Sequence, residues 1–241
     1  MTKLRLKFSK HGPIKFVGHL DVMRYFQKAI RRAEIDIKYS EGFSPHQVLS
    51  FAQPLSVGAT SDGEYLDMTV NSFTSEEDIM SRLNSVMNEG IKITAVKELP
   101  ESAQKAMTES YAARYKVSFR ENHRPDFDLK ESFEKFIGQN TIPAMKKTKS
   151  GEKEIDIKPL IFSYRFCEDD VLDLLLSMNS TNTLKVALLF DTFYKSLGRE
   201  FDPVSLSINR VDIYTSGSDE SGFYIEPFIP DESGERVYLN V

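Results

Sequence analysis

Apolar and polar residues alternate at the start of the chain, where Leu4, Leu6 and Phe8 are separated by charged residues. A period of two is typical of a strand with one buried face, so we predict a strand here. After a Gly-Pro breaker at 12–13, apolar residues recur every three or four positions up to about residue 34. This spacing predicts a helix that begins near residue 19. Its apolar positions are Val22, Phe26, Ala29, Ile30 and Ala33.

In the rest of the first half, the sequence predicts two strands, a second helix and a final strand. Short apolar runs over 48–52 and 64–70, separated by Pro and Gly residues, predict the two strands. Ser75, followed by three acidic residues, is typical of a helix N-terminus, and this helix ends before Gly90. An alternating run over 91–96 predicts the closing strand. The resulting order, β-α-β-β-α-β, is that of a ferredoxin-like unit.

The second half predicts the same order of elements. They are a strand at 115–119, a helix at 127–137, strands at 155–166 and 171–178, a helix at 183–197 and a strand at 206–213. The sequence therefore predicts an α+β fold made of two tandem ferredoxin-like halves. We place these halves at 1–105 and 106–214, and we expect residues 215–241 to form an acidic C-terminal hairpin or tail.

Composition indicates the class of protein and the cellular compartment. The 40% hydrophobic and 28% charged residues are those of an ordinary globular protein. The single cysteine, Cys167, excludes an internal disulfide and an all-cysteine metal or iron–sulfur site, and it favours the cytoplasm. The first residues alternate charge with apolar side chains, and no later run reaches the ~18 apolar residues of a membrane span. We therefore expect neither an export signal nor a membrane partner.

Charge is distributed unevenly along the chain, whose net charge is −5. Residues 1–50 hold ten Lys and Arg against four Asp and Glu, whereas the remaining residues hold 21 against 32. The first segment also holds three of the four histidines. An anionic partner is therefore expected to bind this segment. Its predicted helix displays four cations opposite the apolar stripe, namely Arg24, Lys28, Arg31 and Arg32.

The segment 39–46 holds the densest group of candidate binding residues. Gly42 and Pro45 predict a turn. The side chains that could converge on this turn are Tyr39, Glu41, Phe43, Ser44 and His46. In a binding loop, the aromatic rings would stack on a flat ligand while His46 or Glu41 supplies hydrogen bonds. The alternative is a connector whose aromatic residues pack inward.

His19 lies at the start of the first predicted helix, where an exposed N-terminus can hold an anion. It is a candidate phosphate contact or general base, and the alternative is a local cap. The candidate catalytic residues are thus His46, His19 and Glu41. Because no metal-ligand spacing, P-loop or GxGxxG run accompanies them, we predict neither a metal site nor a cofactor.

A second basic segment runs from Lys146 to Lys153, between a predicted helix and a predicted strand. As a mobile arm, it would bring Lys146 and Lys147 to a phosphate backbone. The alternative is a solvated loop, because Glu152 and Glu154 offset part of its charge.

Several segments carry a resemblance to a known family. The specific ones are 18–21, 39–46, 49–52 and 64–67, which read GHLD, YSEGFSPH, LSFA and EYLD, and the weaker ones are 154–160 and 209–214. Through them, the chain resembles the bacterial radical-SAM-linked proteins of unknown function, which occur alone or joined to the C-terminus of a radical-SAM protein. The last strand departs from that family's usual Arg-Thr pattern, so we assign no role to Asn209 or Arg210.

The resemblance implies partnership with a radical-SAM enzyme. That enzyme would hold the iron–sulfur cluster, because a radical-SAM domain uses three cysteines and this chain has one. The resemblance also implies an association with RNA metabolism. The oligomeric state stays open.

Three functional hypotheses follow. The one we favour is an accessory protein that binds or presents RNA, because aromatic rings stack on bases and cations follow phosphates. The second is a metal-independent RNA-processing enzyme with His46 or His19 as acid and base. The third is a protein-binding adaptor without RNA contact. The predicted RNA contacts are Arg24, Lys28, Arg31, Arg32, Tyr39, Phe43, Ser44, His46, Lys146 and Lys147.

Overall fold

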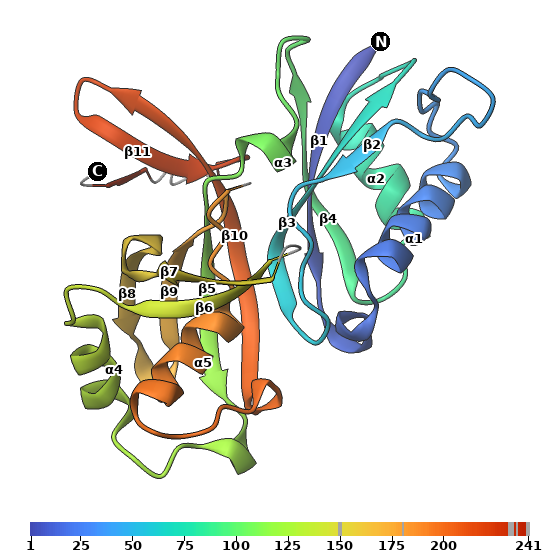
Figure 1. Ribbon diagram of the computed structural model, residues 1–241. Helices are drawn as coiled ribbons and strands as arrows, with labels where there is room; N and C mark the ends of the chain where they lie inside the picture. Colours follow the sequence, from blue (N-terminus) through green and yellow to red (C-terminus); the bar gives the residue numbers. More distant parts are fainter. Residues whose placement is uncertain (149–150, 180, 231–233, 235, 240–241) are drawn as a thin grey trace. The chain divides into compact units, whose positions relative to one another are not determined.

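The computed structural model describes residues 1–148, 151–179, 181–230, 234 and 236–239. It divides into two compact units, one of residues 1–111 with 209–241 and the other of residues 112–208 (Figure 1). Each unit combines helices with mostly antiparallel strands, which confirms the predicted α+β class. Within the described ranges, none of the helices has the length and apolarity needed to span a membrane.

Four antiparallel strands form the main sheet of the first unit. They are β1 (Thr2–Lys10), β2 (Leu49–Phe51), β3 (Thr60–Val70) and β4 (Ile91–Leu99). β1 lies between β4 and β3, and β2 pairs with β3, which gives the order β4-β1-β3-β2 (Figure 1). The register places Leu6 opposite Leu66 on β3 and opposite Val96 on β4.

Two helices, α1 (His19–Arg32) and α2 (Glu76–Val86), pack on one face of this sheet. The apolar residues predicted from the alternation of β1 and the repeat of α1 form the core between them. Its members include Leu4, Leu6, Phe8, Phe26, Ile30, Leu66, Ile79 and Leu83. The predicted N-cap is also present, because the Ser75 hydroxyl accepts a hydrogen bond from the Asp78 N–H at 3.1 Å.

The C-terminal part of the first unit adds a hairpin. β10 (Leu206–Asp219) pairs antiparallel with β11 (Gly222–Pro227), and β12 (Val237–Tyr238) pairs with β11. At residues 209 and 210, β10 also pairs in parallel with the start of β3. The segment expected to be an acidic hairpin or tail therefore contains β11, while residues 231–233, 235 and 240–241 lie outside the described part.

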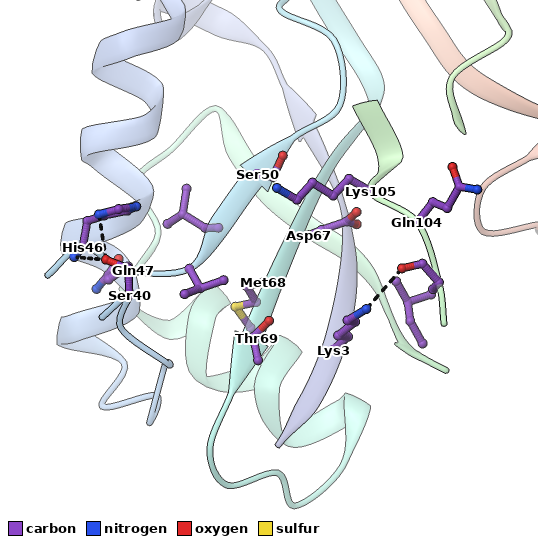
Figure 2. Close-up of a pocket in the computed structure, with 14 residues that line it drawn as sticks. Lys3, Ser40, His46, Gln47, Ser50, Asp67, Met68, Thr69, Gln104 and Lys105 are labelled. Atoms are coloured by element: carbon purple, nitrogen blue, oxygen red, sulfur yellow. Dashed lines mark hydrogen bonds between the residues drawn. The ribbon is translucent and has the colours of Figure 1, made fainter. Parts of the chain in front are cut away.

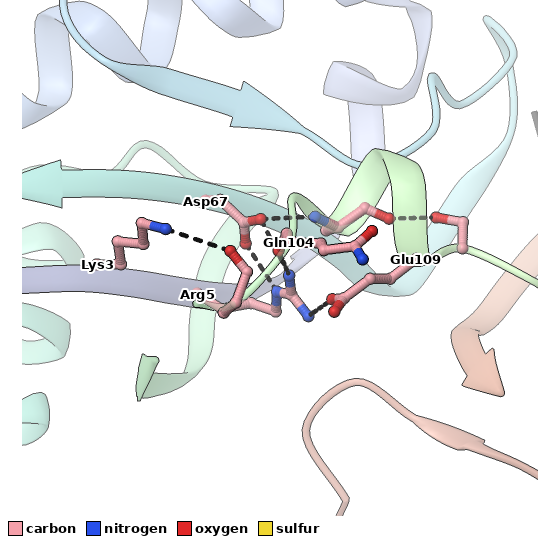
Figure 3. Close-up of polar contacts among 8 residues, drawn as sticks. Lys3, Arg5, Asp67, Gln104 and Glu109 are labelled. Atoms are coloured by element: carbon pink, nitrogen blue, oxygen red, sulfur yellow. Dashed lines mark hydrogen bonds and ion pairs between the residues drawn. The ribbon is translucent and has the colours of Figure 1, made fainter. Parts of the chain in front are cut away.

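The sheet face opposite the helices carries buried charge instead of an apolar core. The side chain of Arg5 is 4% exposed, and it donates to the two carboxylate oxygens of Asp67 at 2.7 and 3.0 Å and to Glu109 at 3.0 Å (Figure 3). Phe228 lies 4.4 Å from the guanidinium. Burial disfavours the charge on Arg5, but its two acidic partners outweigh burial and raise its pKa. The Arg5 side chain on this part of the sheet face is therefore buried and already paired, so it is not available to a ligand.

A second charged group lies farther along the same face. The Tyr65 hydroxyl donates to one oxygen of Asp212 at 2.6 Å, and the Lys7 ammonium donates to the other at 2.6 Å. Burial raises the pKa of Asp212 although Lys7 opposes the shift, and burial together with Asp212 raises the pKa of Tyr65 well above its ordinary value. Phe228 packs edge-on against Tyr65, at 5.1 Å between ring centroids. Near the start of β1, by contrast, a pocket opens on this face.

The second unit has its own sheet and helices. Its sheet consists of β5 (Ala112–Phe119), β8 (Ile161–Phe166) and β9 (Leu172–Ser177), with β9 in the middle and all pairs antiparallel. Its helices are α4 (Leu129–Ile137) and α5 (Val186–Ser196). Aromatic rings fill the space between these elements, and the most buried are Phe133, Phe136, Phe190 and Phe193.

Two sequence predictions about the second unit are wrong. A single strand was predicted over 155–166, but β7 (Gly151–Asp156) ends where Lys158–Leu160 forms a 3-10 turn before β8. The segment predicted as a mobile arm or solvated loop is instead a hairpin of β6 (Pro143–Thr148) and β7. Gly151, with φ 127°, adopts at the start of β7 a backbone conformation that favours glycine. Residues 149 and 150 of this segment lie outside the described part.

Candidate ligand pocket and RNA-binding surface

A pocket of about 410 Å³ opens on the helix-free face of the first unit, at the start of β1 (Figure 2). The strand register explains its floor, because Lys3 on β1 lies opposite Thr69 on β3 and Leu99 on β4. One step along the sheet, Asp67 on β3 lies opposite Ser50 on β2. Residues 103–105 line the pocket from the segment before α3 (Ala106–Glu109). The pocket volume lies within the range of small-ligand sites, about 300–1,000 Å³.

Two lysines give this pocket a positive charge. Lys3 is half-buried, and its ammonium donates to the backbone carbonyls of Glu101 and Ala103, the latter at 3.2 Å. Lys105 is exposed, and its side chain extends over the pocket toward Ser50 (Figure 2). Neither ammonium has an ion pair among the described residues. Carbonyl dipoles hold Lys3 in place but leave its charge uncompensated.

Asp67 is the one acidic residue among the described residues that line the pocket, and both of its carboxylate oxygens accept hydrogen bonds. Besides the two bonds from Arg5, one of its oxygens accepts the Ala106 N–H at 2.6 Å (Figure 3). The carboxylate therefore has little capacity to neutralise the two lysines or to bind a ligand. The positive charge stays available for an anion.

The loop 39–46 borders the pocket on the side of β2. The Ser40 hydroxyl lies 2.9 Å from Nδ1 of His46 and accepts the His46 backbone N–H at 3.1 Å, so the two residues close the base of the loop. Gly42 adopts a φ of 105°, a left-handed conformation that glycine tolerates and other residues rarely adopt. Both Ser40 and His46 line the pocket.

Gln47 follows the loop and is buried, with 5% of its surface exposed. Its Nε2 donates to the Gln27 carbonyl of α1 at 3.2 Å and to the Tyr39 hydroxyl at 3.5 Å. Its Oε1 has no hydrogen-bond donor among the described residues, although Gln47 lines the pocket. A buried acceptor without a donor costs about 1–3 kcal/mol, which a ligand donor would offset.

The predicted loop residues point outward rather than into the core. Phe43 is fully exposed and Tyr39 is 45% exposed, so the alternative of an inward-packed connector is wrong for both. Glu41, Ser44 and His46 are also exposed. An exposed aromatic ring loses no packing when a base stacks on it, and this loop offers two.

The predicted basic helix face is exposed as well. Lys28 and Arg31 have no side-chain partner among the described residues, whereas Arg24 pairs with Asp21 at 3.0 Å and Arg32 donates to the Val86 carbonyl at 3.0 Å. Lys28 and Arg31 are thus the helix cations most available to a phosphate.

His19 does not share the pocket of His46. It lines a separate cavity of about 20 Å³ and packs edge-on against Phe51, at 5.4 Å between ring centroids. Lys10 and Glu64 line the same cavity, and burial lowers the pKa of Lys10. Within the described residues, no three His, Cys, Asp or Glu side chains gather as metal ligands would.

The basic residues of the β6–β7 hairpin belong to the second unit. Lys146 is half-buried and donates to the Thr183 carbonyl at 3.2 Å, and Lys147 on the same strand is exposed. The structure of the first unit therefore unites Tyr39, Phe43, Ser44 and His46 in one loop, while Lys146 and Lys147 lie in another unit.

Several residues at these sites were not singled out from the sequence. Lys3, Gln47 and Lys105 line the pocket but come from distant segments, and no local pattern marks them. Arg210, to which no role was assigned, is buried and donates from Nε to a Glu64 carboxylate oxygen at 2.7 Å. An arginine within an apolar strand pattern was the available signal for a buried ion pair.

The chain matches one known protein family over most of its length. The family model described as "Uncharacterized protein conserved in bacteria (DUF2344)" matches residues 3–186, which contain the pocket, the loop and α1. A search of the curated proteins found no match.

Proposed function

The chain belongs to the bacterial family DUF2344, and on this premise we propose that it is an RNA-binding accessory protein of a radical-SAM enzyme in the cytoplasm. The single observation that carries the RNA part is the exposed Phe43, on a loop next to a positively charged pocket. The radical-SAM partner rests on the resemblance of residues 18–21 and 39–46, and the cytoplasmic location rests on the single cysteine.

We further propose that both units are ferredoxin-like. The first unit supports this with the order β4-β1-β3-β2 and two helices on one face. In the second, β9 lies between β5 and β8, and Leu206–Ile208 at the start of β10 supply a fourth strand segment. Proteins with such sheets commonly place RNA bases on the helix-free face. Here Arg5 and Tyr65 are buried on that face, so we place the proposed RNA contacts at the pocket near the start of β1 and on the loop.

The basic face of α1 supplies the proposed phosphate contacts. Gln47 links the loop to α1 through Gln27, which precedes Lys28 and lies one turn from Arg31. Bases would stack on Phe43 and Tyr39 while the backbone follows these cations. Binding rather than cleavage is favoured because His19 and His46 line different pockets and so do not form an acid–base pair.

The test is the binding of a fluorescent single-stranded RNA across a salt series from about 50 to 200 mM. Lys28→Glu with Arg31→Glu is the test variant. Lys130→Glu with Lys135→Glu, on the exposed face of α4, is the matched control. Because each phosphate contact to a single strand contributes about −0.7 to the slope of log affinity against log salt, the test variant should reduce the slope by about 1.4.

The control variant should bind RNA as the unchanged protein does. Absence of binding at low salt, or an equal loss in both variants, would refute RNA binding by α1 and leave a protein-binding adaptor as the better account.

A further inference from the structure

We infer that the 410 Å³ pocket binds a nucleotide that carries a phosphomonoester, either as the terminal nucleotide of an RNA strand or as a free nucleoside monophosphate. The part of this inference that concerns RNA ends rests on the proposed function. Binding of a free nucleotide to the pocket can be tested independently of RNA binding.

The charge of the pocket selects an anion. Lys3 and Lys105 both lack a carboxylate partner among the described residues, and Asp67 is occupied by Arg5 and Ala106. Two ammonium groups match a phosphomonoester better than a phosphodiester, because a phosphomonoester carries about −1.5 to −2 charges at pH 7 whereas a diester carries one. An RNA end with a phosphate is thus preferred over the interior of a strand.

Hydrogen-bond donors for a phosphate group lie at two places around the pocket (Figure 2). Lys3 keeps one N–H beyond its two carbonyl bonds, and its half-buried position strengthens its attraction for an anion. Lys105 extends over the pocket near the Ser50 hydroxyl (Figure 2). Ammonium and hydroxyl groups donate hydrogen bonds that phosphate oxygens accept.

The remainder of the lining suits a base. Val48, Leu49, Met68 and Leu99 contribute apolar surface to the same pocket. Gln47, which lines the pocket, has a buried side-chain oxygen without a donor in the described structure. A rotation of this amide toward the pocket would let an exocyclic amino group or ring N–H of a base supply that donor while the base covers the apolar residues, which inorganic phosphate cannot do. This combination distinguishes a nucleotide from a simple anion.

The experiment uses the full chain and calorimetric titration with AMP, adenosine and inorganic phosphate. AMP is expected to bind at least tenfold more tightly than either adenosine or phosphate alone. Lys105→Met should weaken AMP binding at least tenfold, and Lys92→Met, at an exposed lysine on β4, should not. Because the Lys105 side chain has no partner among the described residues, its variant should keep the thermal stability of the unchanged protein.

The second arm compares one oligoribonucleotide with a 5′-phosphate, a 3′-phosphate or hydroxyls at both ends. One phosphorylated form should bind at least tenfold more tightly, and Lys105→Met should abolish that difference. Equal binding of all forms, together with no binding of AMP, overturns the inference while the proposed RNA function stands. Binding of AMP that depends on Lys105, without binding of any oligonucleotide, supports the pocket and refutes the proposed function.

Discussion

Replacing Phe43 by Ala is expected to weaken RNA binding and to leave stability unchanged. The ring is fully exposed, so its removal exposes no cavity and loses no buried contact. A base that stacks on an aromatic side chain contributes about 1–3 kcal/mol. At about 1.4 kcal/mol per factor of ten, the variant should bind single-stranded RNA about 5- to 140-fold more weakly.

The assay is fluorescence anisotropy with a labelled single-stranded RNA at one fixed salt concentration, together with thermal unfolding of each protein. Phe16→Ala is the matched control, because Phe16 is an aromatic residue that is 61% exposed and lies outside the loop. Equal affinity of the Phe43 variant and the unchanged protein would refute stacking on this loop. An equal loss in the Phe16 variant would show a general effect of exposed rings instead.

The remaining predictions concern stability and are measured by urea unfolding. Arg5→Met removes a buried cation and leaves the partly buried carboxylates of Asp67 and Glu109 without it, so the free energy of unfolding should fall by about 3 kcal/mol, and a loss below about 1 kcal/mol would contradict the ion-pair account. Ser75→Ala removes the N-cap of α2 and should cost about 1 kcal/mol, whereas no change would show that the cap bond is not formed in solution. Burial raises the pKa of Asp212 above 3.8, so the folded protein keeps this proton to higher pH than the unfolded chain. Its contribution to stability therefore falls as pH rises from 3.8 through the raised pKa. Asp212→Asn should lack this fall, and a stability difference between the two proteins that stays constant with pH would contradict it.

Where the local pattern decided the structure, the sequence was sufficient. The alternation of Leu4, Leu6 and Phe8 predicted β1 because one face of that strand is buried under the helices. The Ser75 cap predicted the start of α2, since the capping bond is a local interaction.

The β6–β7 hairpin was missed because its strands are mainly polar and exposed, so they lack the apolar alternation on which strand prediction rests. The continuous strand over 155–166 was predicted because Ile155 and Ile157 extend the apolar pattern, while the turn at Pro159 carries the chain into a separate strand.

The pocket could be predicted only in part. His46 and Ser40 lie within the loop that the sequence marked as a candidate site. Lys3 and Lys105 come together because residues 100–105 pack back against β1, which no local pattern encodes. The exposure of Phe43 was left open because a loop aromatic residue can pack inward or outward with the same sequence.

The most direct test of the central claim is photochemical crosslinking of the intact protein to a single-stranded RNA that contains 4-thiouridine, with the crosslinked peptides identified by mass spectrometry. The account predicts crosslinks within residues 19–47, which contain α1 and the exposed loop with Tyr39 and Phe43. Crosslinks confined to residues 112–208, or none at RNA concentrations that saturate binding, would contradict it.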